Sequence, residues 1–238
     1  MASLTKKLVF LWKQRSHWHF SKRKTEDIFT QIYRDNTWGG VAGEYFSGSG
    51  STNPNTDLYV NKIIDFVREN HVNHIVDLGC GDFRVMNRVV SAVDAQYTGI
   101  DIVKDLIENH NEKFNTPRIN FLHLNIIDDD LPDGDLVLIR QVFQHLSNDE
   151  ISKILSKISK YKWALITEHV PVSGSIEFNI DKLSGPHIRM KANSGVFIDQ
   201  PPFNIRNVRV LLEYREDDLV KGKMVPAAIR TYLVTNHS

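Results

Sequence analysis

The stretch that decides the fold is HIVDLGCGDF, at positions 74–83. Its first five residues form a short apolar run, which Gly79 and Gly81 close before a helical pattern begins. Glycine lets the backbone turn tightly and approach a ligand closely, where a side chain would collide. The stretch therefore predicts a buried strand, a tight turn and a helix, with a ligand bound at the turn.

The predicted ligand carries a ribose but no pyrophosphate. A dinucleotide-binding turn would have a third glycine at position 84, where this chain has Arg84. Asp101 follows Gly81 by 20 residues, at the end of the next predicted strand. A carboxylate there can accept two hydrogen bonds from ribose hydroxyls, each worth about 1.5 to 3 kcal/mol. The alternative is that the glycines only make a turn and that Asp101 only caps the next helix.

Outward from this turn, apolar runs alternate with helical patterns. Strands are predicted at residues 74–78, 97–102, 119–124, 135–139 and 163–167, and helices at 58–70, 85–93, 107–114 and 151–158. This alternation predicts a mostly parallel sheet with helices on both faces. Two further strands, at 208–214 and 227–234, are joined by a connection too short for a crossover helix, so we expect an antiparallel C-terminal hairpin. The predicted fold is α/β, a Rossmann-like, seven-stranded sheet.

The chain of 238 residues, 41% of them hydrophobic, is long enough for one well-buried domain. We divide it into an N-terminal helical extension with a Gly/Ser-rich lid at residues 1–57 and a ligand-binding domain at 58–238. The lid contains Trp38-Gly39-Gly40 and the run SGSGS at 47–51. Its amides and hydroxyls can close over a ligand. The alternative for this segment is a surface linker.

Charge and cysteine content exclude some classes of protein. Lys plus Arg and Asp plus Glu both number 29, so no net charge draws the chain to nucleic acid or anionic lipid. Residues 1–24 carry seven Lys or Arg and no acid, and they either pack their aromatic residues on the domain or lie on a membrane surface or an anionic substrate. The single cysteine, Cys80, excludes an internal disulfide and a cysteine-built zinc site. With no apolar run long enough to span a bilayer and no leader pattern, we expect a cytoplasmic protein.

These motifs resemble the class I S-adenosylmethionine-dependent methyltransferases. Residues 77–81 look like the first motif of that family, 97–101 like its acidic second-strand motif, and 135–146 like its fourth strand with the loop that follows. The resemblance runs from about residue 36 to the end, and it implies S-adenosylmethionine as cofactor and methyl transfer as reaction. A narrower resemblance, through residues 38–40, 47–52, 81–83 and 140–146, is to an uncharacterised bacterial subgroup often expected to act on small molecules or surface-glycan precursors.

The chain departs from the family pattern at two positions. Phe83 stands where family members commonly have glycine, and Asn125 where they often have an acid. The amide oxygen of Asn125 can still accept a hydrogen bond from an adenine amino group, and Asp128 is the rival for that role. The residues expected to bind the cofactor are Trp38, Ser51, Asp77, Gly79, Cys80, Gly81, Asp82, Asp101, Ile102, Asn125, Ile126, Arg140 and Gln141.

Catalytic residues are expected where the parallel strands end, because ligands bind at that edge of open α/β sheets. His145, after the fourth strand, is the first candidate for a general base, since imidazole titrates near neutrality; alternatively, it caps a helix or bonds a carbonyl. Glu168 and His169, after the fifth strand, are the second candidates. His187 and Arg189 lie in the long segment that follows and could hold an anionic substrate. No metal is required for methyl transfer.

The predicted function is therefore methyl transfer to a small molecule, most directly to a hydroxyl of a sugar-like or anionic acceptor. Three alternatives remain: N-methylation of a small amine, N-methylation of RNA, and a non-catalytic scaffold that binds the cofactor. The sequence carries no nucleic-acid-binding motif, and it does not predict an oligomeric state.

Overall fold

The computed structural model of this protein describes residues 23–41, 43–220 and 222–236. Most of the basic segment at residues 1–24 lies outside these ranges. Within them, no helix combines the length and the apolar character needed to cross a membrane.

The main sheet has seven strands in the order β3-β2-β1-β4-β5-β9-β6. The first five strands in the chain pair in parallel, and β9 pairs antiparallel with both β5 and β6. The strands are β1 (His74–Leu78), β2 (Gln96–Asp101), β3 (Ile119–His123), β4 (Leu136–Arg140), β5 (Trp163–Pro171), β6 (Val208–Arg215) and β9 (Ala227–Thr235). The predicted α/β class and the terminal antiparallel pair are confirmed.

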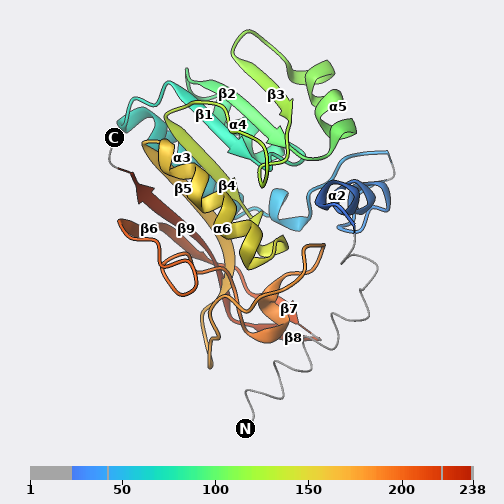
Figure 1. The fold of residues 1–238 in the computed structure, drawn as a ribbon, viewed down its shortest axis with the longest axis vertical. Coiled ribbons are helices and arrows are strands. Elements are labelled where there is room, and N and C mark those ends of the chain that lie inside the picture. The colour runs from blue at the N-terminus through green and yellow to red at the C-terminus, as the bar shows by residue number, and fades with distance from the viewer. Residues whose placement is uncertain (1–22, 42, 221, 237–238) are drawn as a thin grey trace.

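Helices cover both faces of the sheet (Figure 1). They are α2 (Thr25–Arg34), α3 (Thr56–Glu69), α4 (Arg84–Val90), α5 (Lys104–Phe114) and α6 (Asn148–Lys157), with single 3-10 turns η1 (Ser49–Ser51), η2 (Phe143–His145), η3 (Ile158–Lys160) and η4 (Arg189–Ala192). Leu136 and Leu138 of β4 pack with α3 and α4, whereas Val137 and Ile139 pack with α2 and α6. A strand buried on both faces needs such a continuous apolar run.

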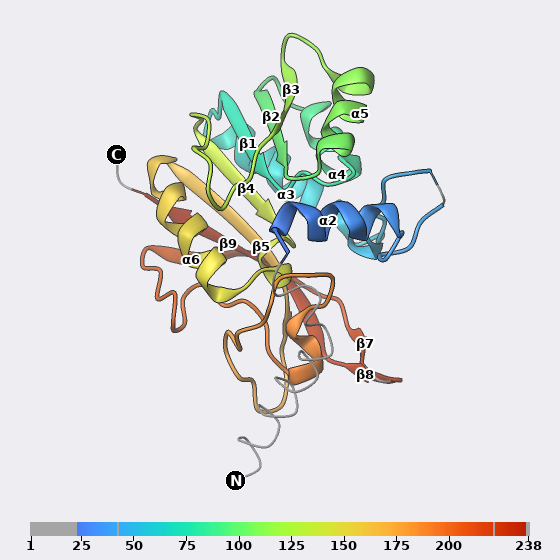
Figure 2. The same cartoon turned by 45° about the vertical axis from the view of Figure 1, so that its right-hand side comes forward.

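The chain reverses direction across the sheet between β1 and β4. From β1 it proceeds outward to β2 and β3, and then returns to β4 on the other side of β1. Open α/β sheets bind ligands at the carboxyl ends of the strands beside such a reversal. Helix α2 crosses this edge (Figure 2), and its Ile28, Phe29 and Ile32 belong to the same apolar core as Val76 and Val137. The division at residues 57 and 58 therefore does not separate two cores.

Two features of the carboxyl-terminal half differ from the sequence expectation. Strand β5 continues to Pro171, four residues beyond the predicted end, because all nine of its residues pair with β9. The connection between β6 and β9 also forms a small hairpin, with β7 (Asp218–Val220) and β8 (Lys223–Val225). Between β5 and β6 lies a long insertion at residues 172–207.

The packing of the Phe83 side chain accounts for the absence of a glycine before α4. Its backbone has a φ of +61°, in the left-handed region where glycine is usual. Its side chain is 2% exposed. The ring packs edge-on against Phe121, with centroids 4.9 Å apart, and also contacts Tyr97 and Phe114. Packing in this aromatic cluster offsets the backbone strain.

We predict that Phe83→Ala lowers the free energy of unfolding by about 3 to 5 kcal/mol, the usual cost of truncating a buried Phe. Alanine at position 83 would keep the same strained, positive φ. The lost free energy of unfolding therefore measures the packing of the Phe83 ring. Urea unfolding followed by tryptophan fluorescence measures it. The control is Leu219→Ala on β7, which is 66% exposed and should change stability by less than about 0.5 kcal/mol. Equal effects in both variants would contradict the role of the cluster.

Candidate active site

A cavity lies at the carboxyl ends of β1, β2 and β4, with about 1050 Å³ of empty space, part of it open to solvent. Every residue that the sequence analysis assigned to cofactor binding lines it, from Trp38 and Ser51 to Arg140 and Gln141, and so does His145. Three side chains of α2 that the sequence analysis missed also line it: Thr25, Phe29 and Tyr33. The spacing of Phe29 and Tyr33, one helical turn apart, was the signal available.

The amides of the turn after β1 donate hydrogen bonds to acceptors within the protein. The amides of Gly79 and Cys80 both donate to the carbonyl oxygen of Ile100, at 2.8 and 2.9 Å. The amide of Gly81 donates to Asp101 Oδ2 at 3.2 Å, and that of Asp82 to Ser47 Oγ at 2.7 Å. A pyrophosphate site would need these N–H groups to point at the ligand. The geometry therefore supports a ligand without phosphate.

Asp101 is a buried carboxylate that lines the cavity and can bind a polar ligand there. It is 8% exposed and lines the cavity, and its Oδ1 accepts the amide of Val103 at 3.1 Å. Burial raises the pKa of Asp101, while the bonds from Val103 and Gly81 act in the opposite direction. These backbone bonds do not occupy every lone pair of the carboxylate, so it keeps capacity for a further hydrogen bond.

Asp77 and Arg140 are the charged pair at the base of the cavity. Tyr97 donates its hydroxyl to Asp77 Oδ2 at 2.7 Å. Burial raises the pKa of Asp77 to about 7, while the bond from Tyr97 and the charge of Arg140 lower it. Arg140 donates to the carbonyl of Gly50 at 2.7 Å, and its buried Nε has no hydrogen-bond partner among the described residues. Burial disfavours the charged form of a carboxylate, and a cationic ligand bound in the cavity would stabilise that charged form.

Asn125, rather than Asp128, lines the cavity. Its oxygen accepts the amide of Ile127 at 3.0 Å, and its Nδ2 donates to Asp128 at 3.0 Å. Asp128 is exposed and orients the Asn125 amide. Because an amide oxygen has two lone pairs, Asn125 can still accept a further bond from a ligand.

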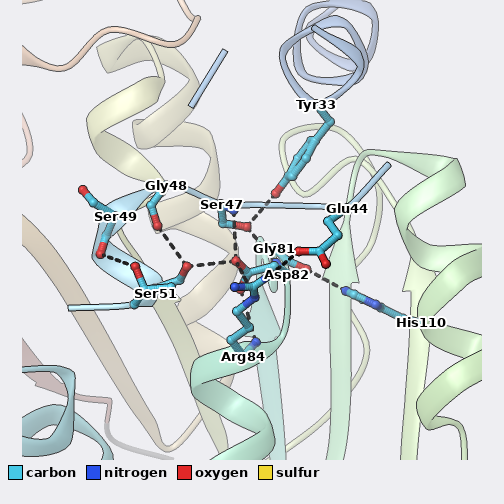
Figure 3. Close-up of polar contacts among 11 residues, drawn as sticks. Tyr33, Glu44, Ser47, Gly48, Ser49, Ser51, Gly81, Asp82, Arg84 and His110 are labelled. Carbon is cyan, nitrogen blue, oxygen red and sulfur yellow. Dashed lines mark hydrogen bonds and ion pairs between the residues drawn. The ribbon is translucent and has the colours of Figure 1, made fainter. Parts of the chain in front are cut away.

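The loop at residues 47–51 is fastened over the turn by Asp82 (Figure 3). Asp82 Oδ2 accepts the amide of Ser47 at 3.0 Å and lies 2.9 Å from Ser51 Oγ. Ser47 Oγ accepts the Asp82 amide and lies 2.8 Å from the hydroxyl of Tyr33. The Asp82 carboxylate is therefore engaged by the loop, and it acts on the cavity by holding that loop.

Gln141 also contacts this loop. Its φ of +57° is unusual for a residue with a side chain. A Cβ added to Gly50 would meet the Gln141 amide oxygen at 2.2 Å, so the loop packs closely on this side chain. Strained backbone of this kind concentrates at functional sites.

His145 presents a neutral imidazole to the cavity. Its Nδ1 lies 3.2 Å from the carbonyl oxygen of Gly185, so Nδ1 carries the hydrogen and Nε2 is left as an acceptor. Gln144 Nε2 lies 3.3 Å from that acceptor nitrogen, and the Trp38 ring lies 5.0 Å from the imidazole. Burial lowers the pKa of His145 to about 3, and Lys182 acts in the same direction, so the imidazole does not titrate near neutrality as the sequence analysis expected.

Glu168 and His169, the second candidates for a base, do not line the cavity. The sequence analysis ended β5 at residue 167, but the strand continues, and its alternating side chains stay within the sheet layers. Glu168 is fully buried and accepts the amides of Phe143 and Gln144, both at 3.0 Å. His169 Nε2 lies 2.7 Å from the carbonyl of Glu216. Arg189, expected to hold an anionic substrate, is also buried away from the cavity.

Residues 75–161 match the model of a family described as a methyltransferase domain. The match covers the segment from β1 into the turn before β5, which supplies most of the cavity. The matched segment is a methyltransferase domain, and the sheet has the Rossmann-like order predicted from the sequence. No curated protein sequence matches the chain significantly.

Solved structures share the fold of this methyltransferase domain at low sequence identity. The Burkholderia thailandensis 1,6-didemethyltoxoflavin-N1-methyltransferase has a TM-score of 0.54 and 14% identity, over 88% of this chain and 87% of its own. The Synechocystis magnesium protoporphyrin IX methyltransferase has a TM-score of 0.53 and 10% identity, over 89% of this chain and 100% of its own. Human N-acetylserotonin methyltransferase has a TM-score of 0.50 and 15% identity, over 87% of this chain; the chain spans 59% of its length.

The cavity of the methyltransferase domain fits S-adenosylmethionine. This cofactor contains a ribose, carries no phosphate and has a sulfonium and an ammonium group. The turn has its amides occupied, and two buried carboxylates, Asp77 and Asp101, face the cavity. Ribose recognition and attraction of a cation are both available from these residues.

We predict that Ser47→Ala accelerates dissociation of S-adenosylhomocysteine about fivefold. The variant removes the oxygen that accepts the Asp82 amide and contacts Tyr33, a loss of about 1 kcal/mol from the closed loop. Stopped-flow fluorescence measures the rate. The control is Ser49→Ala, an exposed serine in the same loop, which should behave as the wild type. If both variants release the ligand at the wild-type rate, the loop does not cover it.

We also predict that affinity for S-adenosylmethionine rises with pH between 5.5 and 7. A bound cation lowers the pKa of Asp77 from about 7, so the complex holds fewer protons than the free protein, and binding strengthens as pH rises. The limiting slope is about tenfold in Kd per pH unit for one proton. Calorimetry in buffers of different ionisation enthalpy measures both Kd and proton release. Asp77→Asn should flatten this dependence, and an unchanged slope in that variant would exclude Asp77 as its source.

Proposed function

We propose that this domain methylates a hydroxyl group of a small, polar acceptor, such as a sugar-like molecule. The observation that carries the proposal is the neutral His145 imidazole, whose Nε2 is an acceptor nitrogen inside the cavity. A hydroxyl must lose its proton when it is methylated, and a positioned imidazole contributes about 10²- to 10⁴-fold to such a step.

The proposal assigns the cofactor-binding roles to residues that line the cavity. Asp101 would accept the ribose hydroxyls, and Asn125 with Ile102 and Ile126 would hold the adenine. Arg140 and Gln141 would hold the methionine part, and Trp38 and Ser51 would close over it. When bound, S-adenosylmethionine supplies a methyl group activated by a positively charged sulfur.

The protein contributes orientation and a proton acceptor. Holding the two reacting groups in line can lower the barrier by up to about 7 to 11 kcal/mol. His145 Nε2 would accept the hydrogen bond of the acceptor hydroxyl in place of the Gln144 amide that now faces it. Because the pKa of His145 is about 3, the imidazole would hold the proton only briefly and pass it to water.

Charge in the cavity favours a neutral acceptor over an anionic one. Arg140 is the cationic side chain among the lining residues, and one of its nitrogens already donates to Gly50. Asp77, Asp82 and Asp101 are all acidic. A sugar-like hydroxyl compound is therefore a better match than a phosphate or carboxylate. The single, buried Cys80 suits the reducing cytoplasm, which is the location we propose.

An acceptor screen tests the proposal. The protein is incubated with S-adenosylmethionine and either sugars, polyols, phenols, sugar phosphates or amines, and S-adenosylhomocysteine is measured. We expect turnover with neutral hydroxyl compounds, and His145→Gln should lower kcat by about 10²- to 10⁴-fold with the Kd for S-adenosylhomocysteine unchanged.

Two comparison variants separate binding from chemistry. Asp101→Ala should weaken binding of S-adenosylhomocysteine by at least tenfold, about 1.4 kcal/mol. Asp94→Ala should not, because Asp94 is exposed and precedes β2, at the end of the strand away from Asp101. Turnover confined to amines, or unchanged kcat in His145→Gln, would overturn the assignment of an O-methyltransferase with His145 as base.

A further inference from the structure

The turn at residues 143–146, directly after β4, carries the two side chains on which the proposed chemistry depends. Gln144 and His145 line the cavity from this turn, and three of its residues form η2. Two buried charged residues outside the cavity lining, Glu168 and Arg189, hydrogen-bond to the backbone of the turn. Neither is accounted for by cofactor binding or by proton transfer.

Glu168 binds the turn from the side of the sheet. Its Oε1 accepts the amide of Phe143 and its Oε2 accepts the amide of Gln144, each at 3.0 Å. The side chain is fully buried. Burial raises the pKa of Glu168 to about 8, while the two amide bonds and Arg189 act in the opposite direction. Both carboxylate oxygens are therefore committed to two consecutive amides.

Arg189 binds the same turn from the 172–207 insertion. Its Nη1 donates to the carbonyls of Phe143 and Gln144, at 3.2 and 3.3 Å, and its Nη2 donates to the carbonyl of Leu146 at 2.8 Å. The side chain is 1% exposed. Its Nε donates to the carbonyl of Ile180 at 2.8 Å, within its own insertion.

Other groups of the insertion bind the remaining carbonyl of the turn. The carbonyl of His145 accepts Lys182 Nζ and the amide of Gly185, both at 2.9 Å. The carbonyl of Gly185 in turn fixes the imidazole through Nδ1. All four carbonyls of the 143–146 turn are thus bonded to the insertion.

Stability alone does not account for this arrangement. Replacing buried charges by well-packed apolar side chains is often neutral or stabilising, because desolvation of each ion is costly. Glu168 instead fixes the direction of two amides of the turn, and Arg189 fixes that of three of its carbonyls. Precise geometry of a reactive side chain requires such support from the residues behind it.

We infer that Glu168 and Arg189 are positioning residues, which hold the 143–146 turn so that Gln144 and His145 face the acceptor. Through Arg189, Lys182 and Gly185, the insertion sets the geometry of the acceptor side of the cavity. The inference rests on the proposed function only in taking this side of the cavity as the place of the acceptor.

The test uses the imidazole of His145 as its readout, in the whole protein without cofactor or acceptor. Nitrogen-15 NMR of labelled histidine reports which ring nitrogen carries hydrogen and at what pH the ring is protonated. In the wild type we expect the Nδ1–H form alone, and no protonation above pH 5. In Glu168→Gln and Arg189→Lys we expect a mixture of both neutral forms, and protonation closer to the ordinary histidine pKa of about 6.5.

Arg118→Lys is the matched control. Arg118 also holds a turn through backbone carbonyls, those of Val90, Val93 and Ala95, but it lies away from the cavity. This variant should lower the melting temperature and leave the His145 signals unchanged. If Glu168→Gln and Arg189→Lys change those signals no more than Arg118→Lys does, their role is structural and the inference fails.

The wild-type protein provides a second check that does not require a folded variant. The amides of Phe143 and Gln144 should exchange with deuterium only through global unfolding, because buried bonds to Glu168 protect them. Fast exchange of these amides, or a wild-type His145 that samples both neutral forms, would overturn the inference. Neither measurement involves turnover, so a negative acceptor screen would count against the proposed function and leave this result intact.

Discussion

The carbonyl oxygen of Ile100 accepts hydrogen bonds from the amides of Gly79 and Cys80. The site depends on this junction between β1 and β2. It ties the end of β1 to the end of β2 and forces the chain to turn at Gly79. Asp101 follows Ile100 directly, so the same junction brings its carboxylate to the amide of Gly81. The position of the Asp101 carboxylate and the occupation of the amides of the turn thus follow from one local arrangement of the backbone.

The cavity is built from three separate parts of the chain. The sheet supplies its base, α2 and the 47–51 loop cover it, and the 172–207 insertion supports the turn that carries Gln144 and His145. Several contacts between these parts use a charged group bonded to backbone: Asp82 to the loop, Arg140 to Gly50, and Glu168 with Arg189 to the turn. Such bonds are stronger than neutral ones and fix direction.

The sheet could be predicted from the sequence because its strands are short apolar runs closed by glycine or acidic residues, as in 74–83. The small β7–β8 hairpin could not, since its strands have three residues each and carry charges. Base candidates were predicted from the rule that ligands lie where parallel strands end. The rule correctly placed His145 in the cavity, but it was wrong for Glu168. Antiparallel pairing with β9 extends β5 beyond residue 167, so Glu168 lies within the strand and not at its end. The contribution of Tyr33 was missed because helical spacing does not reveal which part of the fold a helix packs against.

The placement of α2 has a consequence for synthesis of the chain. Ile28, Phe29 and Ile32 belong to the same apolar core as Val137 and Ile139, which leave the ribosome about 100 residues later. At about 5 to 20 residues per second, that delay is roughly 5 to 20 s. During this interval the core around α2 contains residues of β1 and β2 but lacks those of β4. A cavity whose cover is made before its base cannot use its ligand to guide the early steps of folding, and the cofactor can join only after β4 has emerged.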